Sequence, residues 1–443
     1  MTAVDQVIRH PLAYARQMRG WSQPELAAQI AAAARRRGLR SGVDRQRVWK
    51  WETSRATPDT DSQMLLADAF GIGQGLVRVL GWPDWLPGGD ETRTLAPHST
   101  PAALREALAA RMDRRNFVAY TAASLTGFAH EWATATPAAF AAARQGKPVD
   151  ADLVGSLESI SRNLTTAPTA QRQYTAPLLD DQLKIVTSLV DEGRYSEQVG
   201  KRLHRLAAGL AQTVGWHRFD HGRHAAAARF WHAAVHSAHT CEDHDLGAGV
   251  LSDLAYQSLW LRDPATSVAV LDRALRRPLH PAARSVLHLR KARAHAALGE
   301  EHACTRSLGA AEKNFETAAG AGAAPAWCAW MSRSDLAVDT GRCLLDLGHT
   351  RQAHALIQNG TEVLPVAREK TRAVFLAYEA EGYLRGGEID RAAHAAHTAL
   401  AMAQRIGAPR CTALISGMMP AFKKHKEVPG VAQLLEKAQT ARL

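Results

Sequence analysis

Apolar residues recur along most of this chain at the three- and four-residue spacing that is typical of helices with one buried face. Alanine and leucine dominate these positions, β-branched residues are comparatively sparse, and stretches that predict strands are almost absent. The pattern therefore predicts an all-α protein. Its first helical segment, residues 1–85, is followed at residues 86–101 by a stretch rich in proline, glycine and polar residues, which we interpret as a linker.

The chain beyond this linker divides again by its pattern. Residues 102–195 are predicted to form a helical connecting region with four large apolar anchors, Phe117, Leu125, Phe128 and Trp132. A Thr-Pro step at residues 136–137 interrupts this region, because proline removes a helix hydrogen bond. From residue 196 to residue 443 the pattern repeats over a longer distance, which predicts a repeat domain.

Five segments of the repeat domain carry small residues at fixed offsets. The first small site lies at Gly215, Ala255, Ala292, Gly341 and Ala380. The second, twelve positions later, lies at Ala227, Ser267, Cys304, Ala353 and Ala392. A mostly larger residue follows after four positions and another small one after three more, as in Trp231 and Ala234 of the first segment. Between the two small sites, four segments carry a glycine and the second segment carries Asp263-Pro264 instead.

This pattern resembles the tetratricopeptide repeat, in which two antiparallel helices form a unit of about 34 residues. A large side chain at a helix crossing would push the two axes apart, so small residues recur there. The spacings between segments here, 37–49 residues, are longer than the ideal, and an irregular helical bundle is the alternative. The resemblance implies a tetratricopeptide-like helical solenoid, whose concave face binds a peptide or a partner protein.

Basic residues are concentrated near the N-terminus. Residues 1–60 contain 11 Lys and Arg against 5 Asp and Glu, a net charge of +6, whereas the other 383 residues contain 43 against 38, a net charge of +5. Such a concentrated basic segment is typical of proteins that bind a polyanion, although a solvated basic surface would give the same count.

Residues 12–75 carry the strongest functional signal. A Gly-Trp-Ser-Gln corner separates two helical stretches in the first half, and a turn, a short helix and a Trp-Glu pair make up the second half. The segment resembles the lambda-repressor-like (Cro/C1, Xre) helix-turn-helix family at Leu12, Ala15, Arg16, Arg19, Gly20, Trp21, Ser22, Gln23, Leu26, Ala27, residues 42–52, Pro58 and Gly71. The resemblance implies a DNA-binding domain whose recognition helix enters the major groove.

The chain departs from that family at residues 31–41, where about eleven residues are added before the turn. Eleven residues make about three helical turns, so we expect the second helix to lengthen through residue 37. Arg35, Arg36, Arg37 and Arg40 would then form a basic surface beside the DNA backbone.

We expect a recognition helix from Arg45 to about Ser54 with Asp44 as its N-cap, because a carboxylate there accepts from free backbone N–H groups. Val48 and Trp51 fall on the inner face by their i, i+3 spacing, and Trp49 is also expected in the core. The side chains predicted to contact DNA from the outer face are Arg45, Gln46, Arg47 and Lys50.

Arginine pairs with guanine and glutamine with adenine, so Gln46 and Arg47 are the candidates for reading bases. Gln23 is expected to contact phosphate, as its counterpart does in the family that the segment resembles. Arg19, Arg55 and the run Arg35–Arg37 are further phosphate candidates, which would supply affinity without selectivity.

Other features exclude competing classes. The five cysteines are scattered without a CxxC motif, so we expect neither a disulfide framework nor a zinc ribbon, and the chain fits a reducing cytoplasm. No signal peptide and no run of 18 apolar residues is evident, so no membrane partner is expected. No catalytic motif occurs, so we expect neither an enzyme nor a cofactor.

Seven histidines and Cys241 crowd residues 217–244, and His232 and His236 share one helix face. Their spacing matches no standard metal-ligand pattern. We therefore expect no metal there, and interpret the histidines as a solvated or pH-titrating surface.

These observations predict a sequence-specific, DNA-binding transcriptional regulator that acts as a homodimer on double-stranded DNA in the cytoplasm. Its repeat domain is expected to mediate dimerisation and to bind a peptide, small-molecule or protein effector. The domain order resembles that of the helix-turn-helix and tetratricopeptide regulators of actinobacteria. The alternative is a protein-binding scaffold or adaptor whose helix-turn-helix does not read DNA.

Overall fold

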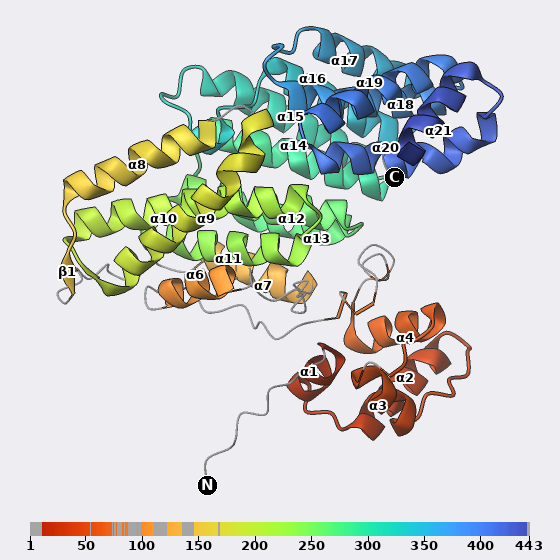
Figure 1. The fold of residues 1–443 in the computed structure, drawn as a ribbon, viewed down its shortest axis with the longest axis horizontal. Coiled ribbons are helices and arrows are strands. Elements are labelled where there is room, and N and C mark those ends of the chain that lie inside the picture. Colours follow the sequence, from red (N-terminus) through yellow and green to blue (C-terminus); the bar gives the residue numbers. More distant parts are fainter. Residues whose placement is uncertain are drawn as a thin grey trace.

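The computed structural model describes residues 11–53, 55–72, 99–109, 122–134, 146–166 and 169–440, and residues 74, 77, 82, 83, 85, 86 and 95. These residues are almost entirely helical (Figure 1), which confirms the all-α prediction. Two short strands, β1 (Lys147–Pro148) and β2 (Gly193–Arg194), pair in parallel with Lys147 opposite Gly193. Among the described helices, none combines the length and the apolar character that crossing a bilayer requires.

Four short helices form the N-terminal unit: α1 (Pro11–Met18), α2 (Gln23–Arg36), α3 (Arg45–Glu52) and α4 (Thr60–Phe70). They enclose a hydrophobic cluster whose fully buried members include Leu12, Leu26, Ile30, Val48 and Leu66. The expected lengthening of the second helix is confirmed. The helix ends at Arg36, with Arg37 as its C-cap. Gly38 follows, and its φ of +70° lies in the left-handed region that glycine adopts without strain.

The connecting helices pack against the helices that follow them. They are α6 (Thr100–Ala109), α7 (Ala122–Thr134), α8 (Ala151–Thr166) and α9 (Thr169–Glu192). Helix α6 contacts α11 and α7 contacts α13, and Figure 1 shows both running beneath these helices. The predicted anchors Leu125, Phe128 and Trp132 are buried. Phe117, the Thr-Pro step and most of the predicted linker lie outside the described residues.

The remaining chain forms consecutive helix pairs. Their bounds are α10 (Glu197–Asp220) with α11 (His224–Thr240), α12 (His244–Trp260) with α13 (Pro264–Ala274), α14 (Pro281–Leu298) with α15 (Glu301–Ala318), α16 (Arg333–Asp346) with α17 (Thr350–Glu362), α18 (Glu369–Arg385) with α19 (Ile389–Arg405), and α20 (Pro409–Phe422) with α21 (Pro429–Thr440). Short 3₁₀ turns, η2 (Ala326–Cys328) and η3 (Lys423–His425), lie before α16 and after α20. The first five pairs pack along their length.

The small residues picked out by their spacing lie where these helices cross. A Cβ added to Gly215 of α10 would stand 2.4 Å from the Trp231 indole nitrogen of α11. A Cβ on Gly341 of α16 would stand 2.8 Å from Ile357 of α17. Every first and second small site is buried. The periodic small residues therefore set the close approach of the two helices in each pair.

The turns inside the pairs follow the glycine pattern. Four of them contain a glycine with positive φ, at Gly222, Gly299, Gly348 and Gly387. The turn between α12 and α13 instead places Arg262 in this region, with φ +66°, before the N-cap Asp263.

The histidine-rich helix α11 is buried, which contradicts the expectation of a solvated surface. His232, His236 and His239 are each less than 10% exposed, because α6 and α7 cover the face that carries them. The Phe128 ring lies 4.3 Å from the His232 ring, and Ser99 Oγ is 3.1 Å from His236 Nδ1. Within the described residues no three His, Cys, Asp or Glu side chains are grouped so that they could hold a metal ion.

Candidate nucleic-acid interface

Helix α3 has one buried face and one exposed face. Asp44 caps its N-terminus, where the carboxylate accepts from the backbone N–H of Arg47 at 2.8 Å. Val48 is fully buried and Trp51 is 4% exposed, as predicted, so the opposite side of the helix turns to solvent. That side carries Arg45, Gln46, Arg47, Trp49 and Lys50, all exposed.

A partly buried ion pair fixes α3 against the two preceding helices. Arg16 of α1 contacts Glu52 at the end of α3, with Nε 2.5 Å from Oε1. The Gln23 amide, at the start of α2, donates to Oε2 of Glu52 at 2.7 Å. Arg16 also donates to the Trp21 carbonyl oxygen at 2.7 Å, in the corner between α1 and α2. These bonds hold the three helices in one geometry, so the outer face of α3 is rigidly presented.

Sequence reasoning did not find this ion pair. Arg16 and Glu52 are 36 positions apart, and a single sequence contains no signal that joins residues at that separation.

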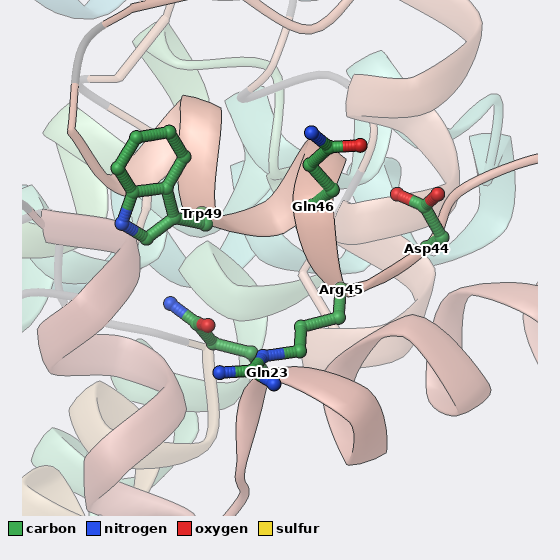
Figure 2. A pocket seen from close by; sticks show the side chains of 5 residues that line it. All are labelled: Gln23, Asp44, Arg45, Gln46 and Trp49. Carbon is green, nitrogen blue, oxygen red and sulfur yellow. The ribbon is translucent and has the colours of Figure 1, made fainter.

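The start of α2 and the start of α3 enclose a hollow of about 500 Å³. It is lined by Gln23, Asp44, Arg45, Gln46 and Trp49 (Figure 2). In the figure the Gln46 and Trp49 side chains project from α3 as separate groups, with Asp44 at the helix start. Three of the predicted DNA-binding residues, Gln23, Arg45 and Gln46, are therefore brought together.

Trp49 is not a core residue, which corrects the sequence expectation. Its side chain is 37% exposed, and the Arg55 guanidinium lies over the indole ring, 4.6 Å from its centroid. The buried face of so short a helix is filled by Val48 and Trp51. Trp49 projects about 100° away from Val48 and about 160° away from Trp51 around the helix axis. The Trp49 indole, with the Arg55 guanidinium over it, therefore lies on the candidate interface and not in the core.

The basic extension of α2 is separate from this hollow. Arg35 and Arg36 are exposed at the end of the helix, about 20 Å from Gln23 at 1.5 Å per residue. Arg37 differs from them, because its guanidinium donates to Asp68 of α4 at 2.8 Å. Arg40 is exposed in the segment that leads to Asp44.

Arg19, another predicted phosphate contact, also has a partner within the protein. Arg19 donates to the Phe70 carbonyl oxygen at 2.7 Å, and burial lowers the pKa of its guanidinium. Asp59, the N-cap of α4, accepts from Ser62, and this bond is the main reason that its pKa is lowered. The charge of the nearby Arg47 lowers the same pKa further.

Comparison with known proteins gives one finding for this region. Residues 12–77 match the family model described as the SP15 N-terminal domain. The match covers α1 to α4, and hence all the residues that line the hollow. A search of curated proteins finds no match to the chain.

Proposed function

We propose that this chain is a sequence-specific DNA-binding transcriptional regulator, in which α2 and α3 form a helix-turn-helix and α3 is the recognition helix. The observation that carries the proposal is the outer face of α3, where Arg45 and Gln46 are exposed beside the start of α2. The ion pair of Arg16 with Glu52 supports it, because a surface that reads bases must be held rigidly.

The chemistry of the face suits the major groove. An arginine guanidinium pairs with O6 and N7 of guanine, and a glutamine amide pairs with N6 and N7 of adenine. Residues at the N-terminal end of a recognition helix reach the base edges, and Arg45 and Gln46 are the first two residues of α3. Exposed Arg35, Arg36 and Lys50 would lie near phosphates and release counterions on binding.

The helix pairs form a tetratricopeptide-like solenoid in this proposal, which mediates dimerisation and binds a peptide, small-molecule or protein effector. Buried small residues at the predicted offsets support the solenoid. A dimer would place two recognition helices on half-sites about one turn of DNA apart. The effector would change DNA affinity by as much as it prefers one of two arrangements of these helices.

The test is binding to DNA selected from a random pool, measured by fluorescence anisotropy across a salt series against scrambled DNA. The Arg45→Ala/Gln46→Ala variant is expected to lose selectivity, because removing each bidentate pair removes about 1–3 kcal/mol of discrimination. The matched control is Arg306→Ala/Gln404→Ala, which removes the same residue types from exposed positions of α15 and α19.

Equal, weak binding of wild-type protein to selected and scrambled DNA, unchanged in the α3 variant, would overturn the proposal. A protein-binding scaffold would then be the better interpretation.

A further inference from the structure

The N-terminal unit ends in an aromatic block that contacts the repeat helices. Trp85 is buried, and its indole nitrogen donates to the Gln63 amide oxygen of α4 at 3.1 Å. Trp82 packs edge-on against it, with ring centroids 5.9 Å apart. Leu86 is fully buried in the same hydrophobic cluster. That cluster also contains Leu261, which lies outside the unit in the turn between α12 and α13.

The residue before Leu261 joins two hydrophobic cores. Trp260 packs against the cluster of the N-terminal unit and also against the large cluster of the helix pairs. Leu261 itself is 6% exposed although it lies in a turn, since the neighbouring unit covers it. Trp260 and Leu261 therefore form the seat of the N-terminal unit.

The turn that carries this seat departs from the pattern of the other pairs. Gly222 and Gly299 occupy the positive-φ position in the turns inside the α10–α11 and α14–α15 pairs, whereas here Arg262 adopts φ +66°. Among the described residues, one other non-glycine has positive φ, Glu242 in the turn between α11 and α12. A side chain in this region meets steric strain that glycine avoids.

A buried charge cluster lies behind the seat. The ring of Phe219 in α10 is 5.7 Å from the Trp260 ring. Asp220, the residue after Phe219, accepts a hydrogen bond from Lys370 of α18. It also forms an ion pair with Arg410 of α20, where Arg410 Nε lies 3.2 Å from Asp220 Oδ1. The Arg410 guanidinium lies 5.6 Å from the Phe219 ring centroid.

The contacts of this cluster span much of the chain. Lys370 is 150 positions from Asp220 in sequence. Arg410 also donates to the Tyr256 hydroxyl of α12 at 3.2 Å, on the helix that ends at the seat. Although burial opposes ionisation, the charges of Lys370 and Arg410 hold the pKa of Asp220 below its usual value. These contacts therefore join α18 and α20, near the C-terminus, to α10 and α12, the two helices that support the seat.

We propose that Trp260 and Leu261 are positioning residues for DNA binding, and that the cluster of Asp220, Lys370 and Arg410 holds their seat in place through Phe219. The seat sets where α3 lies relative to the helix pairs. In a dimer it therefore sets the separation of the two recognition helices, and so the preferred spacing of half-sites. The positioning role rests on the proposed function, whereas the seat itself does not.

The first test compares Leu261→Asp and the milder Trp260→Leu with Val366→Asp, a control at a position that is 82% exposed. Circular dichroism verifies folding, and small-angle X-ray scattering measures the maximum dimension. Both seat variants are expected to release the N-terminal unit, which lengthens the particle, whereas the control is unchanged. If folded seat variants gave the same scattering as the control, Trp260 and Leu261 would not hold the N-terminal unit against the helix pairs, and the proposal would be wrong.

The second test measures DNA binding by the same proteins on one half-site and on paired half-sites of varied spacing. The seat variants are expected to keep half-site affinity within about twofold. They should lose on the order of 10-fold on the spacing that wild type prefers, and discriminate less between spacings. Unchanged spacing preference would overturn the positioning role. If wild-type protein binds no DNA selectively, the proposed function fails, and scattering still decides whether the seat exists.

The third test asks whether the charge cluster acts through the seat. Asp220→Asn, made alone and together with Leu261→Asp, gives a double-mutant cycle on the preferred spacing. Asp220→Asn alone is expected to weaken binding on the order of 5-fold, and to add nothing in the Leu261→Asp background. Additive losses would show that the cluster acts independently and would overturn this part of the proposal.

Discussion

Helices α2 and α3 expose their cationic side chains, whereas several arginines of the helix pairs are largely buried against carboxylates. In α2 and α3, Arg35, Arg36, Arg45 and Lys50 are exposed, and the described residues offer none of them an ion pair. In the helix pairs the arginines pair across neighbouring helices, as Arg290 does with Asp253, Arg293 with Asp339, Arg342 with Glu381 and Arg368 with Asp335.

The two arrangements serve different purposes although both regions carry a net positive charge. A buried pair has lost its water and is stable only while both partners remain, so it specifies how helices fit together. An exposed cation retains its attraction for a polyanion in solution. The placement of charge, more than its sum, separates a candidate binding surface from a structural network.

The largest expected effect comes from removing one partner of a buried pair. Asp253 accepts from Gln212, Trp216 and Arg290. Asp253→Ala would leave the arginine buried and uncompensated, so the free energy of unfolding should fall by about 3–5 kcal/mol. Urea unfolding followed by circular dichroism measures this loss. Arg45→Ala, on the exposed face, should change the same quantity by less than about 0.5 kcal/mol, and a similar loss in both variants would break the comparison.

The next effect tests the close packing of the helix pairs. Gly215→Ala places a methyl group against the Trp231 indole and should destabilise the protein by about 1–3 kcal/mol. Gly309→Ala is the matched control, because nothing lies within 4 Å of its added Cβ in α15. Removing a helical glycine there should stabilise the protein by up to about 1 kcal/mol. Thermal unfolding that gives the two variants the same sign would contradict the role assigned to the small sites.

These glycines also show what a sequence can reveal. The small sites and the turn glycines recur at regular offsets, so periodicity was enough to find them. The prediction for α11 was wrong because the cover comes from α6 and α7, which are at least 90 positions away in sequence. Periodicity distinguishes apolar from polar positions and carries no information about which distant helix covers a face.

The same limit applies to the candidate site. Asp44, Val48 and Trp51 followed from local rules of capping and helical spacing, and the structure agrees. The exposure of Trp49 was not predicted. Val48 and Trp49 are adjacent apolar residues, and a helix of eight residues is too short for its pattern to show which of them faces the core. The Arg37–Asp68 pair was missed because it joins residues 31 positions apart.

A third, smaller effect is a difference between the two regions in how their stability depends on pH. Burial lowers the pKa of His204, in α10, to about 4. Because the unfolded value is higher, the unfolded chain binds the extra proton as pH falls from about 6.5, and stability is lost down to about pH 4. His204 alone should cost at most about 2 kcal/mol between pH 6.5 and pH 5.

Residues 11–72 contain no histidine, so the N-terminal unit should not share this dependence. Urea unfolding at pH 7 and pH 5, compared between wild type and His204→Leu, measures how much His204 contributes to the loss of stability on acidification. A variant that loses as much stability as wild type on acidification would exclude His204 as a contributor.

The smallest expected effect distinguishes the exposed arginines of the basic extension, Arg35 and Arg36, from the paired Arg37. Arg35→Ala/Arg36→Ala should weaken binding to every DNA by a similar factor. It should also reduce the slope of log affinity against log salt by about 0.9 for each phosphate that the variant no longer neutralises. Arg37→Ala should change that slope less, because its guanidinium already contacts Asp68. Anisotropy titrations at several salt concentrations measure both slopes. If Arg37→Ala alone changed the slope as much as the double variant, exposed and paired arginines would not differ in the way that the comparison of the two regions requires.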